Sequence, residues 1–495
     1  MPLDSLFPFD NSYARLPERF FSSLPPTPVS SPTLIKLNQP LALQLGLDPE
    51  LLQAPQGVDV FAGNQVPGGA EPLAMAYAGF QFGGWVPQLG DGRAILLGEL
   101  LDTSGVRHDI QLKGAGRTPF SRGGDGRAAL GPILREYIVS EAMARLGIAT
   151  TRSLAAVTTG DQVARETMLP GAILTRVAKS HVRVGTFQFF AARRDIPALR
   201  ALADYVIDRH YPEATQSERP YLELLASVIR RQAELIASWQ MVGFIHGVMN
   251  TDNTSIVGET IDYGPCAFMD TFHPDQVFSA IDHGGRYAYK NQPPIAHWNL
   301  SGLAQTLLPL IDDHEKTAIG LASEALETFR GQFDALYLAG MRRKLGLTEE
   351  HAEDDALLQG LLTCMAKNQA DFTLTFRGLC AASDPTTTGS QDVGALFAKP
   401  EEFAAWAESW HKRLATEAIS PSDRQTLMRS VNPAFIPRNH RIEEVIQAAT
   451  RCNDLAPFHQ LVEVLGAPFD EQPHNARFRA PPATDEVVHQ TFCGT

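Results

Sequence analysis

One polar stretch limits what this chain can be more than any other part of it. It runs from His246 to Asn253 and is followed closely by Asp262-Tyr263-Gly264. The amide oxygen of Asn253 and the carboxylate of Asp262 suit Mg²⁺, which takes one or two protein oxygens together with phosphate and water. We therefore expect the fold to present this stretch as a loop at a cleft that holds a phosphate-bearing ligand.

The stretch resembles the catalytic loop and metal-binding Asp-x-Gly of protein kinases, with one change. Kinases carry their general base two residues after the His, and that position is Val248 here, which accepts no proton. Asp252 is the remaining carboxylate of the loop and can act as the base if its side chain turns into the cleft. The alternative is that Asp252 caps a local turn. We expect His246 to bond backbone carbonyls within the loop.

Two earlier segments supply what such a site needs on its other side. Gly90, Gly92 and Arg93 lie in a glycine-rich run just before a strand-like segment, and glycine lets backbone N–H groups approach phosphate oxygens. A plain turn between strands is the alternative. Lys113 resembles the strand lysine that grips ATP phosphates in kinases, and Glu136 on a following helix is its expected partner. The chain order of these elements is the strongest signal.

The secondary-structure pattern changes along the chain. Residues 94–100 and 108–114 read as strands, and in the second Ile110 and Leu112 share one face. Residues 133–146 read as a helix ended by Gly147, and long helical patterns such as 221–241 and 317–345 follow residue 205. Residues 24–40, rich in proline, predict an extended arm on the surface. These patterns predict a strand-rich N-terminal part and a helix-rich C-terminal part.

Arginines gather in and near the glycine-rich region. Residues 114–127 contain three arginines and five glycines, with Asp125 and Gly126 near the end of the run, and Arg176 and Arg183 form a second basic edge. Guanidinium groups bind phosphate oxygens in a bidentate way, so this density suits a polyphosphate. A solvated surface loop is the alternative.

Composition removes several classes of protein. A net charge of −14 argues against a partner with a phosphate backbone such as nucleic acid. No apolar run is long enough to span a membrane, and the N-terminus has no leader pattern, so we expect a cytoplasmic protein. The five cysteines are far apart and form no CxxC pair.

Taken together, these segments resemble the selenoprotein O (SelO) family of protein adenylyltransferases over nearly the whole chain. The matching blocks are residues 77–83, 89–94, 111–116, 124–127, 140–143, 174–178, 246–253, 262–265 and 286–289.

The resemblance implies an α+β, bilobal, protein-kinase-like fold. It implies an N-terminal extension over residues 1–70, a strand-rich N-lobe over 71–185 and a helical C-lobe with a C-terminal extension over 186–495.

The resemblance also implies a reaction. ATP would lie in the reverse orientation to that in kinases, and AMP would pass to Ser, Thr or Tyr hydroxyls of proteins with release of pyrophosphate. Asp252 would accept the proton and Glu136 would position Lys113. The other implied roles are ATP binding by Gly90, Gly92, Arg93, Lys113, Asp125, Gly126, Arg176, Arg183 and Asp262, and Mg²⁺ binding by Asn253 and Asp262. UTP with Mn²⁺ stays open as an alternative donor.

Some bacterial relatives use a cysteine near the C-terminus in a regulatory disulfide. This chain ends in Thr491-Phe492-Cys493-Gly494-Thr495, and Cys266 is the implied partner of Cys493. Cytosolic disulfides, where they occur, are usually redox-sensing.

Two other functions stay open on the sequence alone. Ordinary phosphoryl transfer is favoured by Lys113 and Asp262 and opposed by Val248. A non-catalytic nucleotide-binding scaffold is opposed by the presence of both metal ligands, since a scaffold needs no charge-neutralised triphosphate.

Overall fold

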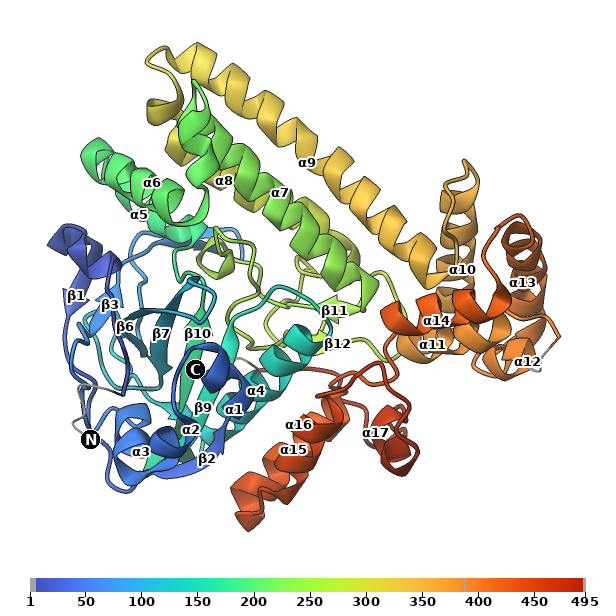
Figure 1. Ribbon diagram of the computed structural model, residues 1–495, viewed down its shortest axis with the longest axis horizontal. Helices are drawn as coiled ribbons and strands as arrows, with labels where there is room; N and C mark the ends of the chain where they lie inside the picture. Colours follow the sequence, from blue (N-terminus) through green and yellow to red (C-terminus); the bar gives the residue numbers. More distant parts are fainter. Residues whose placement is uncertain (1–5, 387–388, 493–495) are drawn as a thin grey trace.

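The strand-like segments of the N-terminal part form one antiparallel sheet (Figure 1). The computed structural model describes residues 6–386 and 389–492. Within them the strand order is β1-β3-β6-β7-β10-β9-β2, and β8 pairs with β10. The strands are β1 (Phe21–Ser23), β2 (Thr33–Leu37), β3 (Leu73–Met75), β6 (Ala94–Leu101), β7 (Arg107–Lys113), β8 (Ala128–Ala129), β9 (Arg152–Ala164) and β10 (Met168–Ala178). The mixed α and β class that the sequence predicts is confirmed.

The two faces of this sheet have different roles. On β7, Ile110 and Leu112 pack into a core with helices α1 (Gln39–Gln44), α2 (Pro49–Gln53) and α3 (Pro55–Phe61), as the alternation predicts. Gln111 and Lys113 face the other way, and Gln111 lies opposite Arg176 of β10. Directly opposed residues of an antiparallel pair share a face, so the sheet brings these polar side chains together.

The helix α4 (Leu130–Arg145) crosses the polar face of the sheet. It begins three residues earlier than the sequence pattern predicts and ends before Gly147, whose φ of +79° suits glycine. Its residues Leu134 and Ile138 are buried against the sheet. This packing turns Glu136 toward β7.

Helices make up most of the chain after residue 183. The long pair α7 (Pro220–Met241) and α9 (Glu315–Lys344) confirms the predicted helical patterns, and α8 packs against both (Figure 1). The remaining helices are α5 (Val184–Ala192), α6 (Ile196–His210), α8 (Gln292–Ile311), α10 (Asp354–Asn368), α11 (Phe372–Ala382), α12 (Gly389–Gly394), α13 (Pro400–Leu414), α14 (Pro421–Val431), α15 (Asn439–Cys452), α16 (Ala456–Val464) and α17 (Ala476–Arg479). Both α15 and α16 return to pack on α4.

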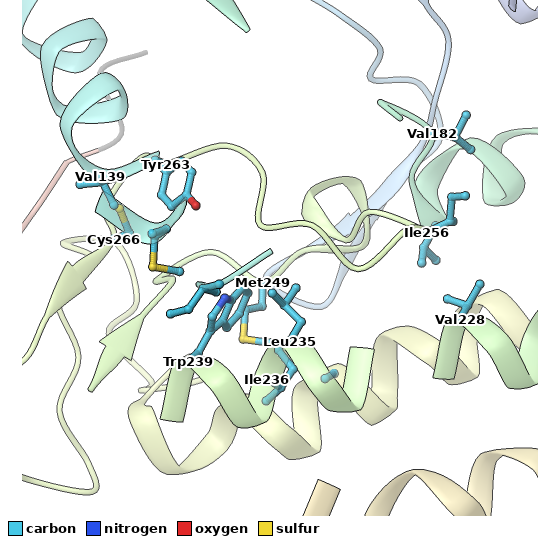
Figure 2. Packing of buried hydrophobic residues seen from close by; sticks show 14 of the residues in the cluster. Val139, Val182, Val228, Leu235, Ile236, Trp239, Met249, Ile256, Tyr263 and Cys266 are labelled. Atoms are coloured by element: carbon cyan, nitrogen blue, oxygen red, sulfur yellow. The ribbon is translucent and has the colours of Figure 1, made fainter. Parts of the chain in front are cut away.

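The polar stretch 246–262 is a loop that is held by a strand pair at its two ends and by packing against helix α7. The strand β11 (Phe244–Ile245) pairs with β12 (Ala267–Phe268), which closes the loop. Met249 lies above Leu235 and Trp239 of α7 in a buried apolar cluster (Figure 2). Because its underside is packed in this way, the loop presents its polar side chains in a fixed arrangement.

A short hairpin covers the loop. Strands β4 (Gly79–Gln81) and β5 (Gly84–Val86) are joined by Phe82 and Gly83, both with positive φ. Two central residues with positive φ define a tight type I′ turn, which matches the natural twist of the two strands.

The predicted surface arm over 24–40 is only partly correct. Its backbone is extended, but Thr33–Leu37 forms the edge strand β2, paired with β9, and Ile35 and Leu37 are buried. Proline is confined to the residues before and after the strand, where no ladder hydrogen bond is lost. Within the described residues, no helix combines the length and apolar character needed to cross a membrane.

Candidate active site

Four charged side chains, from two strands, one helix and the polar loop, meet at the polar face of the sheet. Lys113 of β7 donates to the buried carboxylate of Glu136 on α4. Arg176 of β10 donates through Nε to Glu136 at 2.5 Å and through Nη2 to Asp262 at 2.5 Å. Burial alone would raise the pKa of Asp262, but Arg176, Arg183 and Lys113 hold it well below its ordinary value. The predicted Lys113–Glu136 pair is present, and Arg176 links it to the polar loop.

Arg183 forms the second cationic corner. Its guanidinium lies 3.5 Å from a carboxylate oxygen of Asp262 and 3.9 Å from Asp91. It also lies over the ring of Tyr77, 4.3 Å from the ring centre, an arrangement that stabilises a cation. Burial raises the pKa of Asp91. The guanidinium is thus held by two acids and a ring.

Removing the charge of Glu136 should destabilise the folded chain. Glu136→Gln leaves Lys113 and Arg176 buried with one counter-charge fewer, and breaking a buried pair costs roughly 3–5 kcal/mol. Urea unfolding measures the change. Glu234→Gln is the control, because Glu234 pairs with Arg231 on the exposed side of α7, where such pairs contribute under about 1 kcal/mol. Equal stability of the two variants would show that Glu136 does not offset the buried charges of Lys113 and Arg176.

Asp252 is buried, yet one of its oxygens has no hydrogen-bond partner among the described residues. Gln81 of the hairpin donates to Oδ2 at 3.1 Å, while Oδ1 makes no hydrogen bond within the described residues. Gly79 lies against this carboxylate so closely that a Cβ there would sit 2.5 Å from Oδ1. Burial raises the pKa of Asp252 to about 6. A buried carboxylate with a free oxygen and a raised pKa is suited to accept a proton near neutral pH.

Other loop residues hold the backbone. Nε2 of His246 lies 2.9 Å from the carbonyl of Ile261, so the predicted structural role of His246 is confirmed. Asn253 donates through Nδ2 to the carbonyl of Val248 at 3.0 Å. Since this bond uses the amide nitrogen, the Oδ1 atom of Asn253 is the atom left to act as a ligand.

The glycines of the predicted phosphate loop are required by close packing between two loops. Gly90 has a φ of +99°, and a Cβ there would lie 2.4 Å from the ring of Phe120. Gly126 has a φ of +69°, and a Cβ there would lie 2.0 Å from the carbonyl of Gly116. Their backbone therefore lies where no side chain fits, next to the cavity.

The arginines of residues 114–127 do not all face a ligand. Arg117 donates to the carbonyls of Gly123 and Gly124, and Arg127 donates to those of Thr27 and Pro28. The expectation that the whole cluster serves a polyphosphate is therefore wrong for Arg117, which does not line the cavity, because the tight loop leaves carbonyls that need donors. Asp125 pairs with Arg165 at 2.9 Å.

These residues surround a cavity of about 520 Å³. Among its described lining side chains are seven cations and four carboxylates, so it is locally basic in a chain of net charge −14. A cleft of this sign attracts anionic ligands. The charged lining residues are Arg93, Lys113, Arg122, Arg127, Arg165, Arg176, Arg183, Asp91, Asp125, Asp252 and Asp262, and the uncharged ones include Gly90, Gly92, Gly126, Val248 and Asn253.

The cavity thus unites the predicted ATP-binding and metal-binding residues with Asp252. Glu136 lies behind it, bonded to Lys113 and Arg176. Three residues contribute to the site that the sequence analysis did not predict: Gln81, Asp91 and Gln111. Gln111 donates to Asp91 at 3.3 Å and accepts from Arg176 at 3.4 Å. Only Asp91, set between two glycines, carried a local signal.

Of the predicted redox pair Cys266 and Cys493, only Cys266 lies within the described residues. Cys266 is buried beside Tyr263 and Val139, and burial raises the pKa of its thiol to about 12 (Figure 2). Thr491 donates to the carbonyl of Pro265 at 2.6 Å, so the described tail reaches the neighbour of Cys266. Cys493 lies outside the described residues, and the pairing stays a prediction.

A basic cavity that combines a strand lysine, two buried arginines and several oxygen-bearing side chains suits a ligand rich in phosphate. Comparison with known proteins gives the family. A model of the family described as protein adenylyltransferase SelO matches residues 5–466. The chain belongs to this family.

Close relatives agree over the full length. Proteins named protein nucleotidyltransferase YdiU from Bradyrhizobium diazoefficiens and from Rhodopseudomonas palustris strain HaA2 are 63% and 62% identical, each over 490 residues and 99% of both chains. The one from Methylorubrum populi is 60% identical over 498 residues and the whole of both chains. The chain is therefore an enzyme of the nucleotidyltransferase class.

Proposed function

We propose that this protein transfers AMP from ATP to Ser, Thr or Tyr hydroxyls of acceptor proteins and releases pyrophosphate. Family membership supports the activity. The observation that carries the mechanism is the free Oδ1 of buried Asp252 at a cavity whose usual kinase base position is Val248. The proton acceptor then lies at a different place in the loop, which fits a triphosphate that enters in the reverse orientation.

The cations of the cavity hold the triphosphate. Lys113, Arg176 and Arg183 are fixed by carboxylates and can turn part of their donor capacity to phosphate oxygens. Glu136 positions Lys113 and Arg176 from behind. The remaining ATP contacts in this proposal come from Gly90, Gly92, Arg93, Asp125, Gly126 and Asp262.

Asn253 and Asp262 suit a magnesium ion. The amide oxygen of Asn253 is left for coordination, and the carboxylate of Asp262 is a quarter exposed at the cavity. Two protein oxygens plus phosphate and water form the set that Mg²⁺ prefers. When bound, Mg²⁺ supplies positive charge beside the phosphate oxygens.

The reaction follows from the placement of Asp252. Its Oδ1 accepts the proton of the acceptor hydroxyl, and the hydroxyl oxygen forms a bond to the α-phosphorus. The bond between the α-phosphorus and the bridging oxygen breaks, and pyrophosphate leaves with that electron pair. Arg176, Arg183 and Lys113 stabilise the negative charge that develops on the phosphate oxygens.

The site also supports a two-lobed, kinase-like arrangement. In this arrangement, residues 71–185 supply the lysine side of the cleft, 186–495 supply the polar loop, and 1–70 extend the first lobe. The sheet that carries Lys113 and the helix-packed loop that carries Asp252 both contribute side chains to the cavity lining.

Labelled ATP separates the proposed reaction from its alternatives. We expect the acceptor to retain label from α-labelled ATP and none from γ-labelled ATP. Label from the γ position alone would mean phosphoryl transfer. A protein that binds ATP and transfers neither label would be a scaffold, and an Asp262→Ala variant that serves its partners as well as wild type would agree with that.

The reaction rate should depend on pH through Asp252. Because burial raises its pKa to about 6, the carboxylate is protonated and inactive as a base below that pH and ionised above it. We expect kcat/KM for AMP transfer to fall about tenfold per pH unit below pH 6 and to level off above pH 7. Parallel measurement of ATP affinity shows whether binding shares the trend. A profile that is flat between pH 5 and 7 would contradict Asp252 as the base.

A further inference from the structure

An exposed aromatic patch lies outside the cavity. Trp85 of β5 and Trp298 of α8 are 39% and 37% exposed, although large aromatic side chains are usually buried. Phe80 of β4 lies between them, with its ring centre 4.9 Å from that of Trp85 and 5.2 Å from that of Trp298. The guanidinium of Arg286 lies over Trp298 at 4.8 Å. We call these four side chains the aromatic patch.

The hairpin joins the aromatic patch to the catalytic loop. The backbone N–H of Phe80 donates to Thr251 Oγ1 at 2.8 Å, and that of Phe82 donates to Asn250 Oδ1 at 3.1 Å. Between them, Gln81 donates to Asp252. Successive side chains of a strand point to opposite faces, so Gln81 faces the carboxylate while Phe80 faces the two tryptophans.

The aromatic patch is also held rigid. The tight turn at Phe82 and Gly83 fixes the hairpin, and Phe82 packs on Tyr287, whose hydroxyl donates to Asn250 at 2.7 Å. Single exposed apolar side chains need no explanation, but a preorganised group of aromatic rings marks a contact surface. Tryptophan and arginine are the side chains that most often dominate such contacts.

We propose that the aromatic patch binds the acceptor protein, through an aromatic or large aliphatic side chain within about three residues of the modified hydroxyl, the reach of a short extended segment. This inference rests on the proposed function. The position of the aromatic patch indicates that its ligand is the acceptor protein. The acceptor hydroxyl must reach Asp252, so the acceptor residues on either side of that hydroxyl must pass the hairpin that holds Asp252. The aromatic patch would thus give specificity for particular acceptor hydroxyls, which the cavity by itself does not distinguish.

Synthetic peptides test the inference. Each carries one Ser, Thr or Tyr in a Gly-rich extended segment, with Trp, Leu, Gly or Asp placed two residues before or after it. With α-labelled ATP, we expect the Trp and Leu peptides to be labelled with a kcat/KM about tenfold above that of the Gly peptides. Trp85→Ala and Trp298→Ala should each remove most of this preference and leave the ATP Kd and the labelling of Gly peptides unchanged.

Leu43→Ala is the matched control, because Leu43 is an exposed apolar residue on α1. Equal labelling of all peptides, or a preference that survives both tryptophan changes, would overturn the inference and leave the proposed function intact. A wild-type dimer that becomes monomeric on Trp85→Ala would assign the patch to a second copy and also overturn it. A wild-type protein that labels neither peptides nor itself would remove the proposed function, and this inference with it.

Discussion

Replacing Asp252 by asparagine should lower AMP transfer by about 10³-fold, the usual contribution of a general base. Asparagine keeps the size of the side chain and an oxygen that can accept from Gln81, but it cannot take the proton of the acceptor hydroxyl. The ATP Kd should change little, because the cations that hold the triphosphate are untouched. Single-turnover transfer from α-labelled ATP measures the loss.

A double variant tests whether a carboxylate at the kinase base position can replace Asp252. Adding Val248→Asp to Asp252→Asn places a carboxylate at the position of the kinase base, in the same cavity lining. If the triphosphate lies in the reverse orientation, this double variant should gain no phosphoryl transfer. Near wild-type AMP transfer by Asp252→Asn, or γ-label transfer by the double variant, would contradict the assigned role.

Replacing Asp262 by asparagine should reduce transfer by on the order of 10³-fold, as expected when preorganised charge at the reacting phosphate is lost. The variant loses a magnesium ligand and also frees Arg176 and Arg183 from their shared carboxylate. We therefore expect ATP without divalent metal to bind at least as tightly as it binds wild type, while Mg²⁺ no longer improves transfer. Calorimetric titration with and without Mg²⁺ separates the two effects.

The matched control for this change lies on α9. Asp334 is exposed and pairs with Arg330 one turn away, so Asp334→Asn removes a carboxylate far from the cavity lining. It should leave transfer and ATP binding as in wild type. Transfer by Asp262→Asn that still responds fully to Mg²⁺ would show that the metal is held elsewhere.

The sequence predicts the parts of the site that local patterns determine. Lys113 follows from strand alternation, Glu136 from a helical pattern, and Asn253 and Asp262 from the spacing of one loop. Each of these patterns spans only a few residues, so it can be recognised from the sequence alone. Their meeting is confirmed for Lys113, Glu136 and Asp262 by direct contacts.

Features that depend on distant contacts could not be read in the same way. Gln81 acts through Asp252, which is 171 residues away, and nothing near Gln81 indicates that the hairpin folds over the loop. The edge strand β2 exists because β9 offers an open edge, which a proline-rich pattern does not reveal. Arg117 turns to its own loop because the carbonyls of that loop need donors.

The orientation of the nucleotide decides whether the α- or the γ-phosphorus meets the acceptor hydroxyl, and a crystal structure with α,β-methylene ATP and Mg²⁺ shows it directly. This analogue cannot lose pyrophosphate, so the bound ground state is preserved. We expect the α-phosphorus to be the phosphorus nearest to Asp252 Oδ1, with Asn253 and Asp262 on the metal. A γ-phosphorus nearest to Asp252, with the α-phosphorus deeper in the cavity, would contradict it.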